Sequence, residues 1–381
     1  MSRVGILPPG ALGVSFFYHL SDLGRSIDGQ VTMLERRGSA SSSTLRSQES
    51  FQIAKGSEIL ALPTATILQG DLLSCQAQGT LPEVLLVCPN PDQLLEVVTD
   101  LVELIVRGGV EDLPIVVFSA NGIYFQRLRQ AFIEKLEEAT LFGRLSDLWP
   151  EPMGKIVGRL LRGVTMQTGL REGSGASTLY RPGPRGLTRI AGGDLESRQR
   201  ALAILTGRGG WYELAEDCSP TRIEFDKALV NLSSNLMGLL LAIDDQGHFQ
   251  RLSLASIFQP QHLPRVRELA FHLNAVGKAV RAYSEDDDVE LLISQLVESS
   301  RLHQTHIPSS LQWVGMMLDL GKLEAKMPPT ETWLVDPLLF YAEAAQLDDA
   351  VQYFRTLRDT LIQKLQLAIQ AKEMANDRGA K

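Results

Sequence analysis

Residues 4–13, V-G-I-L-P-P-G-A-L-G, decide the fold of the N-terminal half of this chain. The apolar run Val4–Leu7 is followed by a tight turn, and residues 14–23 then have the apolar period of a packed helix. A second apolar run, residues 30–34, ends in Glu35-Arg36-Arg37. Strand, glycine-containing turn, helix and strand in this order predict a βαβ unit that binds a dinucleotide.

The turn keeps two of the three glycines in the dinucleotide fingerprint G-x-G-x-x-G. Gly10 stands where the backbone approaches a pyrophosphate, and Gly13 stands where the helix contacts the strand. Pro8 replaces the first glycine; proline can turn the chain, but it lacks the N–H group and the wide φ range of glycine. The residues that we predict to hold the pyrophosphate are Pro9, Gly10, Ala11, Leu12 and Gly13.

The residues at the end of the second predicted strand bear on whether the cofactor is NAD or NADP. Glu35 could accept hydrogen bonds from the ribose diol of NAD, whereas Arg36 could hold the 2′-phosphate of NADP. Both residues are therefore predicted to bind the cofactor, and the pair alone leaves NADP and NAD open. The serine-rich residues 39–43 that follow are expected to form a polar, mobile loop.

Further apolar runs at residues 83–88 and 114–118 flank an amphipathic helical segment, residues 92–107. Continuous runs of valine, isoleucine and leucine separated by helices predict a parallel sheet that is covered on both faces. Binding residues in such sheets gather on loops at the carboxyl ends of the strands. Asn121-Gly122 follows the second run and is expected at that edge.

Long helical periods replace the strand pattern near residue 217. Before that point, residues 158–193 are rich in glycine and threonine, and we expect them to form small strands that finish the first domain. We therefore predict an α/β, Rossmann-type domain for dinucleotide binding over residues 1–216. An all-α domain for substrate binding or dimerisation would follow over residues 217–381.

The helical part opens with an apolar stretch, residues 226–243, that three polar side chains interrupt. Lys227, Asn231 and Asn235 lie four residues apart, so one ammonium and two amides fall on one side of a helix. Burying such groups costs several kcal/mol unless hydrogen bonds satisfy them. The stripe therefore indicates either an internal polar network or a site that a ligand completes.

The composition of the 381 residues argues against some classes of function. A net charge of −8 without a basic stripe argues against nucleic acid as the main partner. The apolar runs are too short or too interrupted to span a membrane, and the histidines show no metal-binding pattern. Three cysteines without metal spacing, and no signal peptide, predict a soluble protein of the reducing cytoplasm.

Several short segments carry a resemblance to one enzyme family. They are P-P-G-A-L-G at residues 8–13, Asn121-Gly122, G-V-T at residues 163–165, the Lys-x3-Asn-x3-Asn stripe and the P-T-E that ends at Glu331. In this order they resemble the ketopantoate reductase (2-dehydropantoate 2-reductase) family of pantothenate biosynthesis. The resemblance implies a Rossmann-type domain followed by an all-α domain of the 6-phosphogluconate-dehydrogenase-C-like type.

The resemblance also implies a reaction, the reduction of a small 2-keto acid by NADPH, with NAD kept open by Glu35. Lys227 would donate a proton to the carbonyl oxygen, and Glu331 would hold the substrate hydroxyl. Glu331 would also keep Lys227 charged if the two lie within about 4–6 Å. The implied substrate contacts are Asn121 (which would also touch the cofactor), Asn231, Asn235, Ser310 or its neighbour Ser309, and Glu331. We expect them to meet in a cleft between the two domains.

The chain also departs from the family pattern. Pro8 replaces a glycine, V-C-P-N at residues 87–90 lacks the usual lysine, and more residues than expected separate Ser310 from Glu331. Two alternatives therefore stay open: a relative without activity that keeps the fold for nucleotide binding or assembly, and another two-domain dehydrogenase of the hydroxy-acid or opine type. The charged helical tail, residues 346–381, fits a surface or an oligomer contact and leaves a homodimer open.

Overall fold

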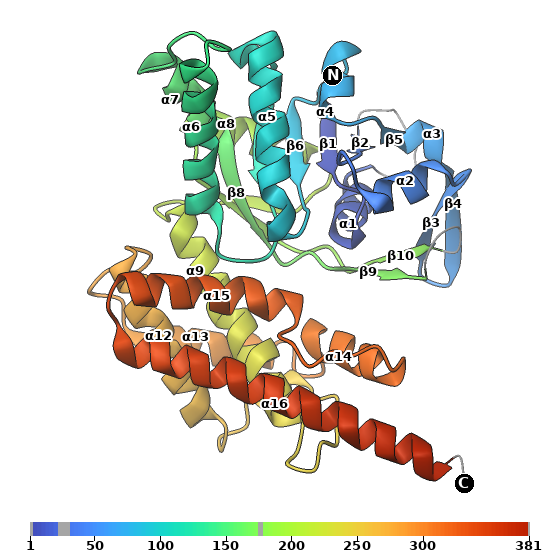
Figure 1. Ribbon diagram of the computed structural model, residues 1–381, viewed down its shortest axis with the longest axis vertical. Coiled ribbons are helices and arrows are strands. Elements are labelled where there is room, and N and C mark those ends of the chain that lie inside the picture. The colour runs from blue at the N-terminus through green and yellow to red at the C-terminus, as the bar shows by residue number, and fades with distance from the viewer. Residues whose placement is uncertain (1–2, 22–30, 174–177, 380–381) are drawn as a thin grey trace. The chain divides into compact units, whose positions relative to one another are not determined.

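The computed structural model describes residues 3–21, 31–173 and 178–379 of the chain. The protein divides into two compact units, Met1–Ile223 and Glu224–Lys381 (Figure 1). The division falls within helix α9 (Pro220–Asn231). The division into residues 1–216 and 217–381, with the roles given to each part, stays a prediction.

In the described part of the first unit, eight strands form the central sheet, in the order β12-β11-β8-β7-β6-β1-β2-β5. Neighbouring strands run parallel except for β8 and β11, which are antiparallel. The strand order changes direction at β1, between β2 and β6, where sheets of this kind bind nucleotides. The strands are β1 (Val4–Leu7), β2 (Val31–Leu34), β5 (Leu68–Gln69), β6 (Val84–Val87), β7 (Ile115–Phe118), β8 (Leu160–Thr165), β11 (Thr188–Ala191) and β12 (Tyr212–Leu214).

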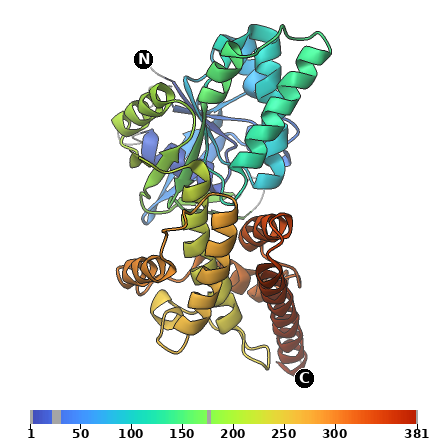
Figure 2. The same cartoon turned by 90° about the vertical axis from the view of Figure 1, so that its left-hand side faces the viewer.

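Helices cover both faces of this sheet, as the apolar runs predicted. Along β6, Leu85 and Val87 enter a core shared with α5 and α6, whereas Val84 and Leu86 enter a core shared with α1 and α8. Figure 1 shows α5 and α6 lying across the strands, and Figure 2 shows the sheet nearly edge-on between its helical layers. The helices of this unit are α1 (Ala11–Leu20), α2 (Ala40–Arg46), α3 (Thr64–Ile67), α4 (Leu72–Ala77), α5 (Leu94–Gly108), α6 (Phe125–Leu141), α7 (Glu151–Gly158) and α8 (Leu195–Gly207), with 3-10 turns at Pro91–Gln93 and Val110–Asp112.

A second sheet lies beside α1, and it changes our interpretation of residues 158–193. Of the strands predicted there, β8 and β11 belong to the central sheet, while β9 (Gly169–Glu172) and β10 (Leu179–Pro182) belong to the second. They join the hairpin of β3 (Ser50–Lys55) and β4 (Glu58–Pro63), which we did not predict. A Cβ at Gly169 would lie 2.4 Å from Ala11 O, so β9 packs directly on the start of α1.

The serine-rich segment, residues 39–43, is not the loop that we expected. It begins helix α2, because Ser39 caps the helix by accepting a 3.3 Å hydrogen bond from Ser42 N. Leu45 anchors the helix in the core with 1 % of its surface exposed. The cap and the apolar anchor outweigh the weak helix propensity of serine.

The described part of the second unit is helical apart from one isolated β-bridge, Ile243–Phe249. The predicted helix over residues 226–243 is present as α9 and α10 (Met237–Ala242), joined by a π-helical turn at Leu232–Leu236. The other helices are α11 (Leu254–Ile257), α12 (Leu263–Ala279), α13 (Val289–Arg301), α14 (Ser309–Asp319), α15 (Pro329–Ala344) and α16 (Asp348–Gly379).

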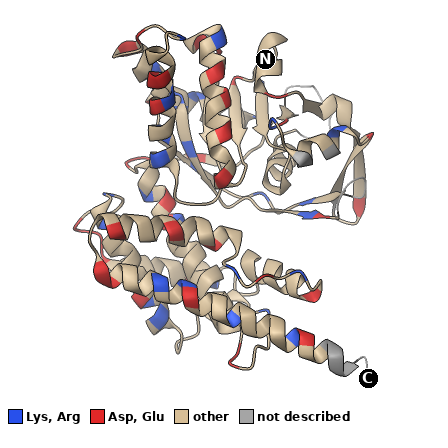
Figure 3. Cartoon of the chain, in the orientation of Figure 1, with Lys and Arg blue, Asp and Glu red and all other residues tan. Residues whose placement is uncertain are grey.

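The charged side chains of both units are interspersed over the helices, with acidic and basic residues on the same elements (Figure 3). Helix α5 carries Glu96, Asp100 and Glu103 at helical spacing, with Arg107 in its last turn. Among the described helices, none combines the length and the apolar character needed to cross a bilayer.

Candidate functional site

The glycine turn after β1 has the geometry that a pyrophosphate requires. A Cβ at Gly13 would lie 2.2 Å from Pro8 O, so only glycine allows this close contact of helix and turn. At Gly10 an added Cβ would meet no atom within 4 Å, which leaves space for a ligand to approach the backbone. Among the described residues no side chain caps the N-terminus of α1, and the first turn of this helix holds no acidic residue.

Pro8 fits into this turn without disrupting it. The Leu7–Pro8 peptide bond is cis, and Pro8 O accepts a 2.8 Å hydrogen bond from Gly10 N. The neighbouring Pro9 O accepts a 3.2 Å hydrogen bond from the buried Tyr180 hydroxyl of β10. The second sheet therefore supports the turn directly, a role that the sequence pattern did not reveal.

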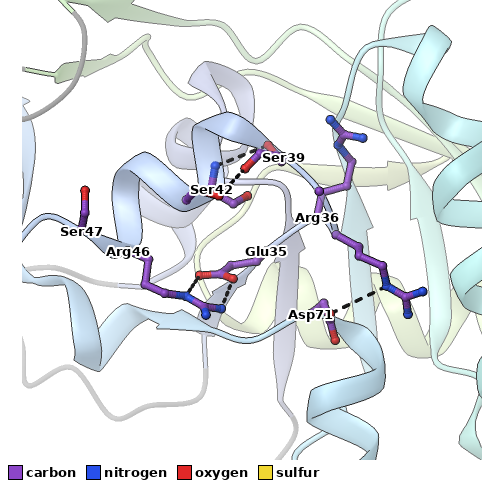
Figure 4. A pocket seen from close by; sticks show the side chains of 10 residues that line it. Glu35, Arg36, Ser39, Ser42, Arg46, Ser47 and Asp71 are labelled. Atoms are coloured by element: carbon purple, nitrogen blue, oxygen red, sulfur yellow. Dashed lines mark hydrogen bonds and ion pairs between the residues drawn. The ribbon is translucent and has the colours of Figure 1, made fainter.

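A cavity of about 370 Å³ lies at the end of β2 (Figure 4). Arg46 of α2 binds both carboxylate oxygens of Glu35, with Nε 2.8 Å from Oε1. This contact raises the pKa of the Arg46 guanidinium. The lining residues are Glu35, Arg36, Arg37, Gly38, Ser39, Ser42, Ser43, Arg46, Ser47 and Asp71.

The other two arginines of the cavity form ion pairs with acidic residues of α5 and with Asp71, which caps α4. Arg36 forms an ion pair with Glu96, and Arg37 lies 3.4 Å from Asp100. Ser42 is different: its hydroxyl is buried, and no described residue forms a hydrogen bond with it. A buried hydroxyl at the wall of a cavity is a group that a ligand can satisfy.

Asn121, the predicted contact for cofactor and substrate, is exposed in the loop after β7. Arg162 of β8 donates hydrogen bonds to the Ala120 and Gly122 carbonyls of this loop. Arg162 is buried, and we did not predict a role for it from the sequence. Its only sequence signal is an arginine inside an otherwise apolar strand, L-L-R-G-V-T.

The polar stripe of the second unit is largely buried. Asn231 and Asn235 are 7 % and 5 % exposed, and Lys227 is partly exposed on α9. Burial lowers the pKa of Lys227 to about 8. An ammonium with this pKa is still protonated at neutral pH but releases its proton more readily than an ordinary lysine.

Hydrogen bonds join three of the predicted substrate residues. Ser310 N donates to Asn235 Oδ1 at 3.2 Å, and Ser310 Oγ donates to Glu331 Oε1 at 2.6 Å. Glu331 is fully buried in the first turn of α15, and none of the described residues bonds its Oε2. Burial raises the pKa of Glu331 to about 7, although the Ser310 bond opposes the shift. The carboxyl therefore exchanges its proton near neutral pH.

Two expectations for this region need comment. Our expectation that Glu331 keeps Lys227 charged, if the two lie within about 4–6 Å, stays a prediction, whereas burial by itself lowers the pKa of Lys227. Of the two serines, Ser310 points into the buried network, whereas Ser309 is exposed. His306, which precedes α14, has a lowered pKa because of burial, His303 and the charge of Lys227, so it lies within electrostatic range of Lys227.

The comparisons with known proteins show the fold. No protein-family model and no curated protein matches the sequence. A solved structure of D-mandelate dehydrogenase with NADH and anilino(oxo)acetate is 15 % identical, with a TM-score of 0.65, and the match covers 96 % of this chain and 98 % of that one. Dimeric ketopantoate reductase from Staphylococcus aureus is 13 % identical with a TM-score of 0.54, covering 94 % and 99 %. The structure of 2-dehydropantoate 2-reductase from Porphyromonas gingivalis W83 is 14 % identical, with a TM-score of 0.57, and the match covers 95 % of this chain and 99 % of that one.

The chain therefore has the two-domain fold of ketopantoate reductases and of D-mandelate dehydrogenase, an α/β unit with a mixed, mainly parallel sheet followed by a helical unit. The predicted resemblance is confirmed at the level of the fold. At such low identity, the likeness carries neither substrate nor residue roles.

Proposed function

We propose that the protein is an NAD(P)-dependent oxidoreductase that interconverts a 2-keto acid and its 2-hydroxy acid. The observation that carries this proposal is a pair of ionisable groups in the helical unit with pKa values near neutrality, the partly exposed Lys227 at about 8 and the buried Glu331, bonded to Ser310, at about 7. Groups tuned in this way are common where protons are transferred. The fold shared with reductases of 2-keto acids supports the same class of reaction.

The first unit would hold the cofactor. The open space at Gly10, the uncapped N-terminus of α1 and the buried Ser42 hydroxyl fit a dinucleotide. A bound reduced nicotinamide would supply the hydride. The proposed contacts are Pro9, Gly10, Ala11, Leu12, Gly13, Glu35, Arg36 and Asn121.

We favour NADP over NAD, because three arginines and several serines line the cavity at the end of β2 against two carboxylates. This balance suits a 2′-phosphate. NAD remains the second choice for two reasons. Glu35 keeps lone pairs that could accept a ribose hydroxyl, and the D-mandelate dehydrogenase structures were determined with NADH.

The second unit would act on the substrate. Lys227 would transfer a proton from Nζ to the carbonyl oxygen as negative charge develops there. Asn231 and Asn235 would orient the carboxylate and hydroxyl groups, and Ser310 would assist through its bond to Glu331. After turnover Lys227 would regain its proton from solvent, which its pKa of about 8 allows at neutral pH.

A second candidate is a dehydrogenase of an aromatic 2-hydroxy acid. The TM-score of 0.65 with D-mandelate dehydrogenase exceeds those of the ketopantoate reductases described above. Both candidates share one chemistry, because reduction of a keto acid is the reverse of oxidation of the hydroxy acid. Substrate preference separates them, with ketopantoate on one side and the keto acid of mandelate on the other.

Thermal stability and turnover test the proposal together. Cofactor at about 100 times its dissociation constant should stabilise the native protein by roughly 2.7 kcal/mol. We then expect oxidation of NADPH or NADH with a panel of 2-keto acids that includes both named substrates. Binding without turnover would favour the alternative of a relative without activity. If neither cofactor raises the Tm at millimolar concentration and calorimetry shows no heat, the proposal is wrong. A small-molecule 2-keto acid as partner, a homodimer and a cytoplasmic location stay predictions of the same proposal.

A further inference from the structure

Arg162 is an almost fully buried arginine, 2 % exposed, at the centre of β8. Its Nη1 donates to Phe118 O at 2.7 Å and to Gly163 O at 2.9 Å. Its Nη2 donates to Ala120 O at 2.9 Å and to Gly122 O at 3.1 Å. Three of these four carbonyls belong to the segment that runs from the end of β7 through the Asn121 loop.

The surroundings of the guanidinium explain how a buried charge is tolerated. A buried cation needs hydrogen bonds to offset the loss of water, and the planar fork of arginine can make several at once. The guanidinium carbon also lies 4.5 Å from the centre of the Tyr124 ring. The Tyr124 hydroxyl donates to Ala120 O at 3.1 Å, so one carbonyl binds both residues.

These bonds fix the backbone on both sides of Asn121. Ala120 O defines the peptide plane that precedes Asn121, and Gly122 O defines the plane that follows Gly122. Gly122 has a φ of +127°, a conformation that other residues rarely adopt. With these carbonyls held by Arg162, Asn121 remains exposed at the edge of the sheet.

The place of this loop in the sheet indicates which part of a dinucleotide it would meet. In the strand order β7-β6-β1-β2, the loop follows β7, on the side of β1 opposite to β2. A dinucleotide that places its pyrophosphate at the start of α1 and its adenosine ribose at the end of β2 extends its other half over β6 and β7. That half is the nicotinamide.

We infer that Arg162 is a positioning residue that sets Asn121 for the nicotinamide end of the cofactor. The inference rests on the proposed function, but it concerns a residue to which that function assigns no contact. A purely structural role would affect the stability of the sheet without distinguishing one end of the cofactor from the other.

Two ligands separate these roles. NADP⁺ carries the nicotinamide, and 2′-phospho-ADP-ribose is the same molecule without it. Arg162→Met should weaken NADP⁺ binding by about tenfold, the effect of one lost hydrogen bond, and should leave the affinity for 2′-phospho-ADP-ribose unchanged. Asn121→Ala should show the same selectivity, and the double variant should lose no more than the larger single effect.

Arg159 provides a matched control. It also binds backbone carbonyls, Val110 O at 2.9 Å and Leu113 O at 2.7 Å, but these precede β7 and lie at the other end of that strand. Arg159→Met should therefore leave the affinities for both ligands unchanged. If Arg162→Met fails to fold, Arg162→Lys, which keeps the charge without the fork, and Asn121→Ala are tested in its place.

Three results would overturn the inference. Equal loss of affinity for both ligands would show that Arg162 does not act at the nicotinamide end. A lowered Tm with both affinities unchanged would leave Arg162 a structural role only. If the wild-type protein binds neither ligand, the proposed function itself fails, and this outcome is recognised before any variant is made.

Discussion

The two polar regions of this chain handle charge in opposite ways. In the cavity at the end of β2, Arg36, Arg37 and Arg46 each contact a carboxylate, and one member of each pair (Glu96, Arg37 or Arg46) is solvent-exposed. In the helical unit, Glu331 is fully buried and accepts a hydrogen bond from the neutral hydroxyl of Ser310. The cavity therefore holds paired charges, whereas the helical unit holds a carboxyl group, Glu331, whose pKa of about 7 leaves it partly protonated at neutral pH.

This difference has a functional consequence. Ion pairs with one member open to solvent can be rearranged, so a phosphate can replace a carboxylate as the partner of an arginine, which suits recognition of an anion. Buried groups with neutral partners have pKa values displaced toward neutrality, which suits proton transfer. The comparison predicts large effects on catalysis from the buried region and smaller effects on cofactor choice from the cavity.

Lys227→Ala should have the largest effect. Loss of a general acid should lower kcat for keto-acid reduction by about 10²–10⁴-fold and leave the Kd for the cofactor nearly unchanged. Steady-state kinetics and calorimetry measure the two quantities. Lys322→Ala, at an exposed position of the same unit, serves as control and should be neutral. A Lys227→Ala variant as active as wild type would remove the role proposed here.

The pH dependence of turnover tests the same residue independently. Because Lys227 must carry its proton, kcat/KM for reduction should be constant well below pH 8 and decrease above it, as the pKa of about 8 implies. The oxidation of the hydroxy acid needs the neutral amine and should show the opposite trend. A profile without inflection between pH 7 and 9 would be inconsistent with the assignment.

Glu331→Gln should change how stability depends on pH. Burial raises the pKa of this carboxyl from 4.5 to about 7, so the native state binds more protons than the unfolded state between these values. The stability from this group is therefore fully present below pH 4.5 and is lost as the pH rises through 7. Denaturant unfolding should show the wild type losing on the order of 3 kcal/mol relative to the variant over this window. Parallel curves for the two proteins would contradict the prediction.

Ser310→Ala should have a moderate effect on the same network. The Ser310 hydroxyl donates to Glu331 Oε1 and opposes the rise of the Glu331 pKa. Its loss should reduce the free energy of unfolding by about 1–3 kcal/mol and raise the Glu331 pKa further. Urea unfolding at pH 8 gives the first quantity, and the pH dependence of stability gives the second. Ser309→Ala, the exposed neighbour, is the matched control.

The smallest effects are expected in the cavity. Arg36→Ala and Arg46→Ala should each weaken NADPH more than NADH, by roughly tenfold at most, because other cationic groups remain nearby. Arg37→Ala, whose guanidinium lies near Asp100 and Asp71, provides a comparison at the same rim. Equal losses for both cofactors would remove Arg36 and Arg46 as 2′-phosphate ligands.

The sequence predicted the features that depend on local pattern. The strands β1, β6 and β7 were recognisable because their residues are apolar on both faces, and the turn because glycine is needed at residues 10 and 13. The Lys-x3-Asn-x3-Asn stripe, followed later in the chain by the P-T-E segment, indicated the fold of the ketopantoate reductases. The hydrogen bonds among Asn235, Ser310 and Glu331 had no local signal, since they join residues 75 and 21 positions apart.

Other features escaped because tertiary contacts decide them. Helix α2 forms from a serine-rich segment only because Ser39 caps it and Leu45 reaches the core. The hairpin β3–β4 gains its place by pairing with β10, more than a hundred residues later in the chain. The sequence shows Arg162 only as a single charged residue within a strand, because its four carbonyl partners are identified by the tertiary structure alone.

The π-helical turn at Leu232–Leu236 gives the polar stripe a further property. Met237 N bonds Leu232 O, five residues back, so the turn accommodates one more residue than an α-helix would. If the same residues formed an unbroken α-helix instead, everything downstream would be rotated by about 100° about the helix axis. The hydrogen bond between Ser310 N and Asn235 therefore depends on the number of residues in the turn, which sets the direction of Asn235 around the helix axis, as well as on the identity of the side chains. A chain could gain or lose this alignment through a single-codon insertion or deletion, with every polar residue of the stripe retained.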